Sequence, residues 1–202
     1  MTDDIWHYIF VDRVFDLFMM SDWEGLLGWC KERTKIEPKD DYAWHCLGEA
    51  NFFLERYDDA ISAYREVLYI DSENTDTWFD LGLVFDNLNR HIDAIDAYRH
   101  TLRIDPEHTP AWYCLGDAYV ELKRYDDAIE AYRQALSIDP KEEYAWQKLG
   151  DVYIDLNRYD DAIDAYSQAL SIDPEHEYAW KKLMETCALK ECIGYFGSKE
   201  RL

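Results

Sequence analysis

The side chains of this sequence that could take part in chemistry are mostly carboxylates, together with six histidines and five cysteines. A catalytic acid or base needs surroundings that shift its pKa away from that of its neighbours, yet Asp and Glu recur here at regular intervals. The histidines are scattered, and the spacing of Cys187 and Cys192 does not place them on one helical face. No phosphate-binding loop or nucleophile motif is present. We therefore predict that the protein is not an enzyme and holds no metal ion or cofactor.

The overall charge is strongly acidic, with a formal net charge of −22 and a pI near 4.4. Such a chain should repel nucleic acid and anionic membranes, and should attract basic partners where the charge faces a binding surface. Hydrophobic residues make up 48% of the chain, which is enough for a buried core. The composition thus favours a folded protein that binds other proteins rather than nucleic acid.

The cysteines and the N-terminus indicate a cytoplasmic protein. The number of cysteines is odd and no CxxC pair occurs, which favours a reducing compartment in which they serve mainly as small packing residues. The apolar N-terminal segment lacks a basic start and is interrupted by Asp12, Arg13 and Asp16. It therefore resembles neither a signal peptide nor a membrane span.

Several residue types recur together at one constant interval along the chain. The recurring positions are Trp44, Trp78, Trp112, Trp146 and Trp180; Leu47, Leu81, Leu115, Leu149 and Leu183; Gly48, Gly82, Gly116 and Gly150; Ala60, Ala94, Ala128 and Ala162; and Tyr64, Tyr98, Tyr132 and Tyr166. A constant interval of this length is the mark of a repeat architecture, in which each unit packs mainly on its neighbours.

Each repeat contains two helical patterns joined by a short turn. In the first repeat, Trp44, Leu47 and Gly48 share one helical face, and a second stripe begins at Ala60. Paired aspartates open the second helix, where carboxylates favour the positive end of the helix dipole. An Ile-Asp-Pro sequence ends the later repeats, because proline disfavours helix at the residue before it. We expect the glycines to face the alanines, so that the two backbones approach closely.

These features resemble the tetratricopeptide repeat, whose unit is a helix–turn–helix of about 34 residues. The third repeat shows the resemblance in Trp112-Tyr113-Cys114-Leu115-Gly116, followed by the positions Tyr119, Tyr125, Ala128, Tyr132, Ala135 and Pro140. Departures from the pattern are few: Asn51, Val67, His91 and Thr101 replace the expected residue types. The resemblance implies an all-α fold, an α-α superhelix of antiparallel helix pairs with terminal capping helices.

The resemblance divides the chain into seven segments. We expect a degenerate helix pair over residues 1–40, four full repeats over 41–74, 75–108, 109–142 and 143–176, a capping helix over 177–193 and a flexible tail over 194–202. In residues 1–40, Ile36 and Pro38 keep the phase of the repeat, although the Trp, Leu and Gly marks are missing. A capping helix covers the apolar face that the last repeat would otherwise expose.

Membership of this family would imply a concave groove lined by the first helix of each repeat. The side chains that the packing pattern leaves free for such a groove are Tyr42, His45, Glu49, Phe79, Leu83, Asp86, Tyr113, Asp117, Glu121, Tyr144, Asp151 and Asp155. They combine aromatic rings with carboxylates, which suit an apolar anchor and the cations of Lys or Arg. We expect an interaction scaffold that binds an extended or helical peptide with basic residues.

An equally open interpretation is that much of the acidity serves helix capping and solubility, and that the aromatic rings support neighbouring helices.

One known function of the family is not expected. Some members bind the C-terminal carboxylate of chaperones through Lys, Asn and Arg, but His45, Glu49, Asp80, Pro110 and Cys114 stand at the matching positions here. None of them is a strong donor to a carboxylate, and Lys148 alone does not replace the clamp.

The alternative function is self-assembly through the N-terminal segment. The apolar residues there are Ile5, Trp6, Tyr8, Ile9, Phe10, Val11, Val14, Phe15, Leu17, Phe18, Met19 and Met20. They cover more than one face of a helix, so that one face can pack on the first full repeat while another stays free for a second copy or a partner helix. The competing interpretation is that the N-terminal segment is a well-buried cap that simply ends the array of repeats.

Overall fold

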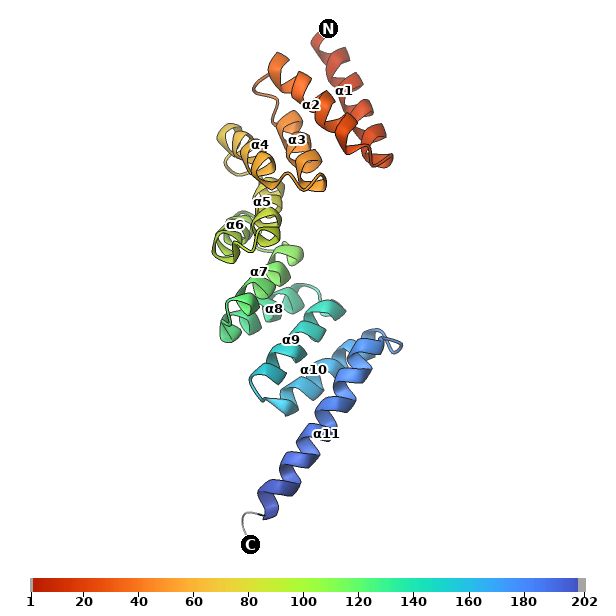
Figure 1. Cartoon of the computed structure of the whole chain (residues 1–202), viewed down its shortest axis with the longest axis vertical. Coiled ribbons are helices and arrows are strands. Elements are labelled where there is room, and N and C mark those ends of the chain that lie inside the picture. Colours follow the sequence, from red (N-terminus) through yellow and green to blue (C-terminus); the bar gives the residue numbers. More distant parts are fainter. Residues whose placement is uncertain (1, 200–202) are drawn as a thin grey trace. The chain divides into compact units, whose positions relative to one another are not determined.

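The computed structural model describes the backbone of residues 2–199 and the side chains of residues 9–190. This part of the chain folds into eleven α-helices and contains no strand (Figure 1). The helices are α1 (Thr2–Met19), α2 (Trp23–Ile36), α3 (Asp41–Phe53), α4 (Tyr57–Ile70), α5 (Thr75–Asn87), α6 (His91–Ile104), α7 (Thr109–Glu121), α8 (Tyr125–Ile138), α9 (Glu143–Asp155), α10 (Tyr159–Ile172) and α11 (Glu177–Lys199). They form two compact units, Met1–Ile104 and Asp105–Leu202.

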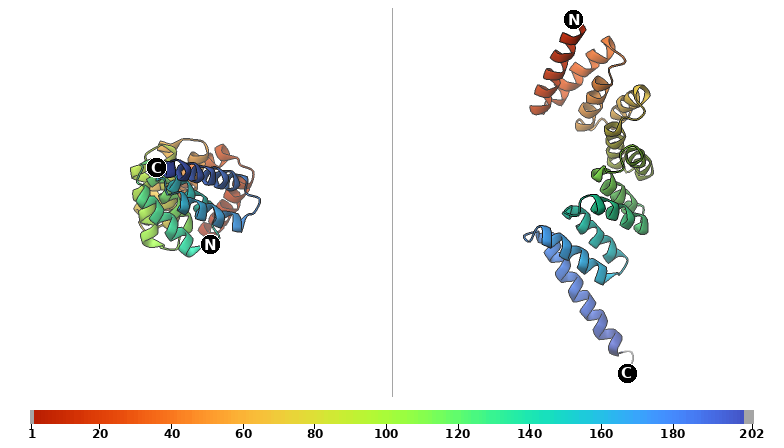
Figure 2. Two further views of the ribbon diagram at one scale, coloured as in Figure 1. Left: turned by 90° about the horizontal axis from the view of Figure 1, so that it is seen from below. Right: turned by 180° about the vertical axis from the view of Figure 1, so that it is seen from behind.

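Each repeat is one antiparallel pair of helices. The first helix of a pair has 13 residues and the second has 14, and the pairs α3–α4, α5–α6, α7–α8 and α9–α10 can be followed in Figures 1 and 2. The pair α1–α2 precedes them, and α2 begins and ends one repeat length before α4. Residues 2–36 therefore keep the phase of the repeat even though most of its marker residues are absent.

The turn within each pair depends on one residue in the left-handed region. Glu55, Asn89, Lys123 and Asn157 have φ values of 56–58°. In the third repeat, the amide of Lys123 donates to the carbonyl of Val120, and the next amide donates to the carbonyl of Tyr119, both at 2.8 Å. These bonds satisfy carbonyls that the end of α7 would otherwise leave open, and they reverse the chain into α8.

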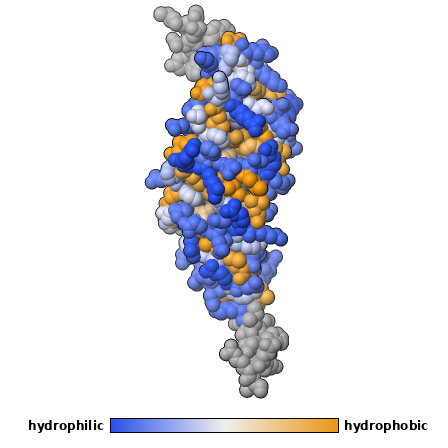
Figure 3. Space-filling model, turned by 90° about the vertical axis from the view of Figure 1, so that its left-hand side faces the viewer, coloured by the Kyte–Doolittle hydropathy of each residue, from blue (hydrophilic) through white to orange (hydrophobic). Residues whose placement is uncertain are grey.

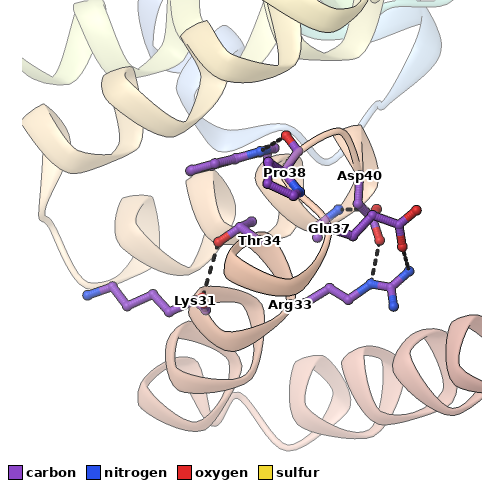
Figure 4. A network of polar contacts seen from close by, with 8 residues as sticks. Lys31, Arg33, Thr34, Glu37, Pro38 and Asp40 are labelled. Atoms are coloured by element: carbon purple, nitrogen blue, oxygen red, sulfur yellow. Dashed lines mark hydrogen bonds and ion pairs between the residues drawn. The ribbon is translucent and has the colours of Figure 1, made fainter.

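The turn between pairs is closed by the tryptophan of the next repeat. The indole Nε1 of Trp44 donates to the carbonyl oxygen of Pro38 at 3.0 Å, and the tryptophan of every later repeat makes the same bond six residues back. In the first of these turns, Asp40 caps α3 and pairs with Arg33 at 2.6 Å, while Arg33 also reaches Glu37 (Figure 4). Ser72 replaces proline in the second turn, yet its carbonyl still accepts the indole hydrogen at 2.9 Å. The bond therefore depends on backbone geometry rather than on proline.

Within a pair, the glycine of the first helix packs against the tyrosine ring of the second. A Cβ atom added to Gly48, Gly82, Gly116 or Gly150 would lie 2.3–2.6 Å from Cε1 of Tyr64, Tyr98, Tyr132 or Tyr166, respectively. The atoms nearest to the added Cβ positions thus belong to tyrosine rings, which the sequence alone did not pair with the glycines. All four rings are buried, and apolar side chains reach the surface only in patches between hydrophilic ones on the side shown in Figure 3.

One face of α1 packs on the first repeat and another face stays exposed. Phe10, Val14 and Leu17 are buried in a core that also includes residues of α2 and α3. Phe15 and Met19 are exposed on the same helix. The side chains of Ile5, Trp6 and Tyr8 lie outside the described residues. None of the helices in residues 2–199 combines the length and the apolar character that a membrane span requires.

The last helix differs from the expected ending. α11 runs to Lys199, whereas we expected a capping helix that ends at residue 193 and a flexible tail from Gly194; residues 200–202 lie outside the described part. A glycine costs a helix only about 1 kcal/mol, and no proline interrupts this segment, so backbone hydrogen bonds can continue through Gly194 and Gly197. On the same helix, Met184 occupies the position of the repeat glycine and is 64% exposed.

The glycine–tyrosine contact predicts the effect of a single methyl group. Gly116→Ala places Cβ 2.5 Å from the ring of Tyr132, so the substitution should lower the free energy of unfolding by roughly 1–3 kcal/mol. Gly28→Ala in α2 is the matched control, because no atom lies within 4 Å of its added Cβ and alanine is the better helix former. Urea titration should show a lower unfolding free energy for Gly116→Ala than for the wild type, and no such loss for Gly28→Ala. Equal unfolding midpoints for the two variants would contradict close packing of the glycine on the tyrosine ring.

Candidate functional site

The twelve side chains predicted to line a binding surface all lie on the first helices of the repeats, and none of them is fully buried. Six belong to each unit: Tyr42, His45, Glu49, Phe79, Leu83 and Asp86 to the first, and Tyr113, Asp117, Glu121, Tyr144, Asp151 and Asp155 to the second. The structure brings several of them into direct contact, and those contacts decide what the surface can bind.

In the second unit, Asp117 joins three helices. Its Oδ1 accepts a hydrogen bond of 2.6 Å from the hydroxyl of Tyr132 on α8, and its Oδ2 accepts one of 2.6 Å from the hydroxyl of Tyr144 on α9. Burial, followed by the nearby carboxylate, raises the pKa of both hydroxyls, so they remain donors at neutral pH. We call this arrangement an acid–tyrosine bracket, since one carboxylate holds its own repeat and the next.

A second bracket lies one repeat further along the chain, although both of its hydroxyls donate to the same carboxylate oxygen, Oδ1. Asp151 on α9 accepts the hydroxyl of Tyr166 on α10 at 2.7 Å and the hydroxyl of Tyr178 on α11 at 2.9 Å. The capping helix therefore contributes to the site as the first helices of the repeats do. Hydrogen bonds to an ionised group are stronger than neutral ones, so each bracket both stabilises a junction and fixes the direction of its carboxylate.

Lysine side chains lie over the outer tyrosine of each bracket. Nζ of Lys148 is 5.1 Å from the ring centroid of Tyr144 and 3.5 Å from Oδ1 of Asp117, and Nζ of Lys182 is 5.5 Å from the ring of Tyr178. A ring face beside a carboxylate is a favourable place for an ammonium group. The chain thus places two of its own cations over these rings.

The first unit has a different arrangement around His45. Nε2 of His45 lies 2.9 Å from Oδ2 of Asp80 on α5, and Nδ1 lies 3.7 Å from Oε2 of Glu49 on its own helix. Burial alone would lower the pKa of His45, but the close contacts and charges of the two carboxylates outweigh it and raise this pKa to about 10. A protonated imidazole therefore joins two repeats here, in place of the tyrosine hydroxyls of the second unit.

In the second repeat the hydroxyl of the buried tyrosine has a different hydrogen-bond acceptor. Leu83 stands where Asp117 and Asp151 stand in later repeats, so the hydroxyl of Tyr98 donates instead to Oδ2 of Asp86, one turn further along α5, at 2.7 Å. The other oxygen of Asp86 lies 3.2 Å from Nδ1 of His91. Asp86 is therefore engaged in holding α5 on α6.

The remaining predicted residues lie around these contacts. The rings of Tyr113 and Tyr144 meet edge to face at 5.6 Å, those of Tyr42 and Phe10 do so at 6.1 Å, and the ring of Phe79 is 5.9 Å from that of Tyr98. Glu121 and Asp155 are exposed at the ends of α7 and α9. Desolvation, followed by the charge of Asp155, raises the pKa of the Tyr125 hydroxyl in the preceding repeat, which supports the interpretation that some of the acidity acts between repeats.

Sequence reasoning missed the second-helix tyrosines and the lysines of this surface. Tyr132 and Tyr166 were assigned only to packing, although their hydroxyls reach the carboxylates. Tyr178 could have been found, because it lies one repeat length after Tyr144. Among the described side chains, no three His, Cys, Asp or Glu residues come together in a group that could hold a metal ion.

Three sequence models described as tetratricopeptide repeats match the chain, over residues 41–74, 79–143 and 121–187. The chain belongs to the tetratricopeptide repeat family. The predicted family and all-α solenoid fold are thereby confirmed, and proteins of this family are typically non-catalytic scaffolds for protein interactions. No curated protein matches the sequence of the chain.

Solved structures of tetratricopeptide repeat proteins have the same fold. A crystal structure of MamA is 24% identical with a TM-score of 0.76, covering 79% of this chain and 94% of its own. A MamA fragment from Desulfovibrio magneticus RS-1 is 20% identical with a TM-score of 0.78, covering 84% and 96%. YrrB, described as a TPR protein with an unusual peptide-binding site, is 19% identical with a TM-score of 0.73, covering 85% of this chain and 89% of its own.

The brackets predict that one hydroxyl contributes to the stability of the second unit. Tyr144→Phe removes a donor to Asp117 and should lower the free energy of unfolding by about 1.5–3 kcal/mol, the range for hydrogen bonds to charged groups. Tyr159→Phe is the control, because its hydroxyl reaches only Asn157, two residues away, at an exposed site. The two variants should be compared by urea titration, and a similar loss in both would argue against the bracket.

His45 predicts a pH dependence in the first unit. Because its pKa is raised in the folded protein, its contribution to stability is complete below pH 6.5 and is lost as the pH rises toward about 10. The wild type should exceed His45→Gln in unfolding free energy by roughly 1–3 kcal/mol at pH 6, and this difference should shrink by pH 10. Urea midpoints of both proteins measured across this pH range would show the change. A difference that stays constant with pH would mean that the two carboxylates do not raise the pKa of His45.

Proposed function

We propose that this protein is a non-catalytic interaction scaffold, and that the first helices α7, α9 and α11 of its second unit bind a polypeptide segment with basic residues and an apolar anchor. Membership of the tetratricopeptide repeat family supports the general role. The observation that carries the finer proposal is the position of Lys148, whose ammonium group lies over the ring of Tyr144 beside Asp117. A lysine of a ligand would find the same ring face and carboxylate edge.

The brackets leave part of the carboxylate surface available. A carboxylate has about four lone-pair sites, and Asp117 uses two of them for tyrosine hydroxyls. Its side chain is 32% exposed, and the nearby Glu121 is exposed as well. A ligand could therefore add a charged hydrogen bond at the rim without breaking the bracket, and the tyrosine rings would supply the apolar contact.

The internal lysine provides the test. Lys148→Met removes the cation that competes with the ligand, so a labelled peptide in which lysine and arginine alternate with leucine should bind about three- to tenfold more tightly. Lys141→Met makes the same change of charge in the exposed turn before α9 and serves as the control. Fluorescence anisotropy at several salt concentrations measures both, and binding should weaken as salt increases.

Two results would reject the basic-ligand proposal. One is a preference for the corresponding peptide with glutamate in place of lysine and arginine. The other is an equal gain of affinity in the two lysine variants, since this would assign the effect to net charge rather than to the site. Glu121→Lys should weaken the same interaction. Substitution of Asp117 is unsuitable for this purpose because it would also open the bracket.

A second candidate function, self-association through α1, is supported by the exposed apolar side chains at the end of that helix and directly after it. Phe15, Met19 and Met20 are 65%, 69% and 73% exposed, respectively, next to the buried face that packs on the first repeat. Burying such side chains between two copies would remove apolar surface from water, which is the main driving force for association.

Light scattering can decide this second candidate. The wild type should show a mass above the 24.1 kDa of one chain at high concentration, and Phe15→Gln combined with Met19→Gln should return it to one chain. Ile36→Gln is the control, because it removes a side chain that is 78% exposed on α2. A wild type that stays at the mass of one chain would reject self-association.

A further inference from the structure

Two surface notches occur at equivalent places in the two units, each between the second helix of one repeat and both helices of the next. The notch in the first unit has a volume of about 480 Å³ and is lined by α4, α5 and α6, and the notch in the second has about 680 Å³ and is lined by α8, α9 and α10. Arg65, Trp78 and Leu81 of the first correspond, two repeats later, to Arg133, Trp146 and Leu149 of the second. The notches share no lining residue with the site proposed above.

The two notches differ in what lies on the tryptophan. In the first, the imidazole of His100 stacks on the indole of Trp78, with centroids 4.2 Å apart and planes 11° from parallel. Gln168 takes the place of His100 in the second notch. Among the described residues, no ring stacks on Trp146. In the first notch a ring of the chain itself therefore covers the tryptophan, and in the larger second notch no ring of the described residues does.

The tryptophan faces are held in the same way in both notches. The indole Nε1 of Trp78 donates to the carbonyl of Ser72 at 2.9 Å, and that of Trp146 donates to the carbonyl of Pro140 at 3.0 Å. The wall of the second notch is fixed as well, since Nη2 of Arg133 donates to the hydroxyl of Tyr153 at 3.0 Å. A planar surface that is already oriented costs a ligand little reorganisation.

His100 indicates the chemistry that such a surface accepts. Burial, followed by the charge of Arg103, lowers the pKa of His100, so the ring that covers Trp78 is neutral at pH 7. The second notch has both signs of charge on its lining, Arg133 with Asp161 and Asp164. Asp161 is paired with Arg158 at 2.8 Å, whereas Asp164 is exposed and can accept a hydrogen bond from the edge of a ring. A neutral aromatic ring with a polar hydrogen fits this combination.

We propose that the notch between α8, α9 and α10 binds a tyrosine or tryptophan side chain of a partner polypeptide, stacked on Trp146 in the position that His100 holds on Trp78. The phenol O–H or indole N–H of that side chain would donate to Asp164. This is a second interaction surface, and it is independent of whether the first helices bind a basic segment.

The experiment uses the full chain with N-acetyl-tyrosinamide and N-acetyl-tryptophanamide as probes and N-acetyl-leucinamide as the comparison. The indole N–H signals are followed by ¹H–¹⁵N NMR, and Trp146→Phe identifies the signal of Trp146. The aromatic amides should shift this signal in a saturable way, and the leucine amide should not. Gln168→His should weaken the effect about fivefold, because the new imidazole can cover the indole as His100 does.

The reverse substitution tests the same idea in the first unit. His100→Gln should uncover Trp78, so that its indole signal begins to respond to the aromatic amides, whereas it stays unchanged in the wild type. Three results would overturn the proposal: no saturable shift at Trp146, an equal shift with the leucine amide, or an undiminished shift in Gln168→His. Both substituted side chains lie at the surface, and unchanged indole signals outside the notches will show that the variants are folded.

Discussion

The fold depends on the contact between a glycine in the first helix of each repeat and a tyrosine ring in the second. Because the glycine has no side chain, the ring can lie against the backbone of the first helix, and a Cβ atom there would come within 2.6 Å of it. This contact sets how closely the two helices approach. It also carries the tyrosine hydroxyl across to the surface of the first helices, where the carboxylates lie. One small residue thus determines both the packing of a repeat and the chemistry of its exposed edge.

The same hydroxyls would couple stability to recognition on the surface where we propose that a ligand binds. Asp117 and Asp151 occupy positions where a ligand could meet them, yet each already holds two tyrosines from different helices. A carboxylate with fixed partners keeps its direction, and a fixed direction favours the binding of a cation. The acidic side chains are therefore neither purely structural nor purely available, and the lysines that lie over the outer tyrosines show how a cation fits between them.

Much of this architecture could be predicted because the repeat marks contacts that recur. The helix pairs could be located from the tryptophan, glycine and tyrosine residues that recur at one constant interval. The same interval also predicts the bounds of α2, although most of the recurring residue types are missing there. The helical phase also placed the twelve candidate side chains on faces that are not fully buried. It did not show that Tyr132 reaches Asp117 or that His45 reaches Asp80, because these contacts depend on how separate helices pack. The length of α11 was missed because a helix can continue on backbone hydrogen bonds without an apolar stripe.

The exposed Met184 has a consequence for the number of repeats that can be stacked in this way. In every full repeat the equivalent position is a glycine, which forms the socket for a tyrosine ring. Met184 stands at that position on α11, so a helix carrying the repeat tyrosine would meet a side chain there instead of the bare backbone that α10 meets on α9. Met184 therefore distinguishes α11 from the first helices of the full repeats, and replacing it with glycine would restore the surface on which a further tyrosine-bearing helix packs.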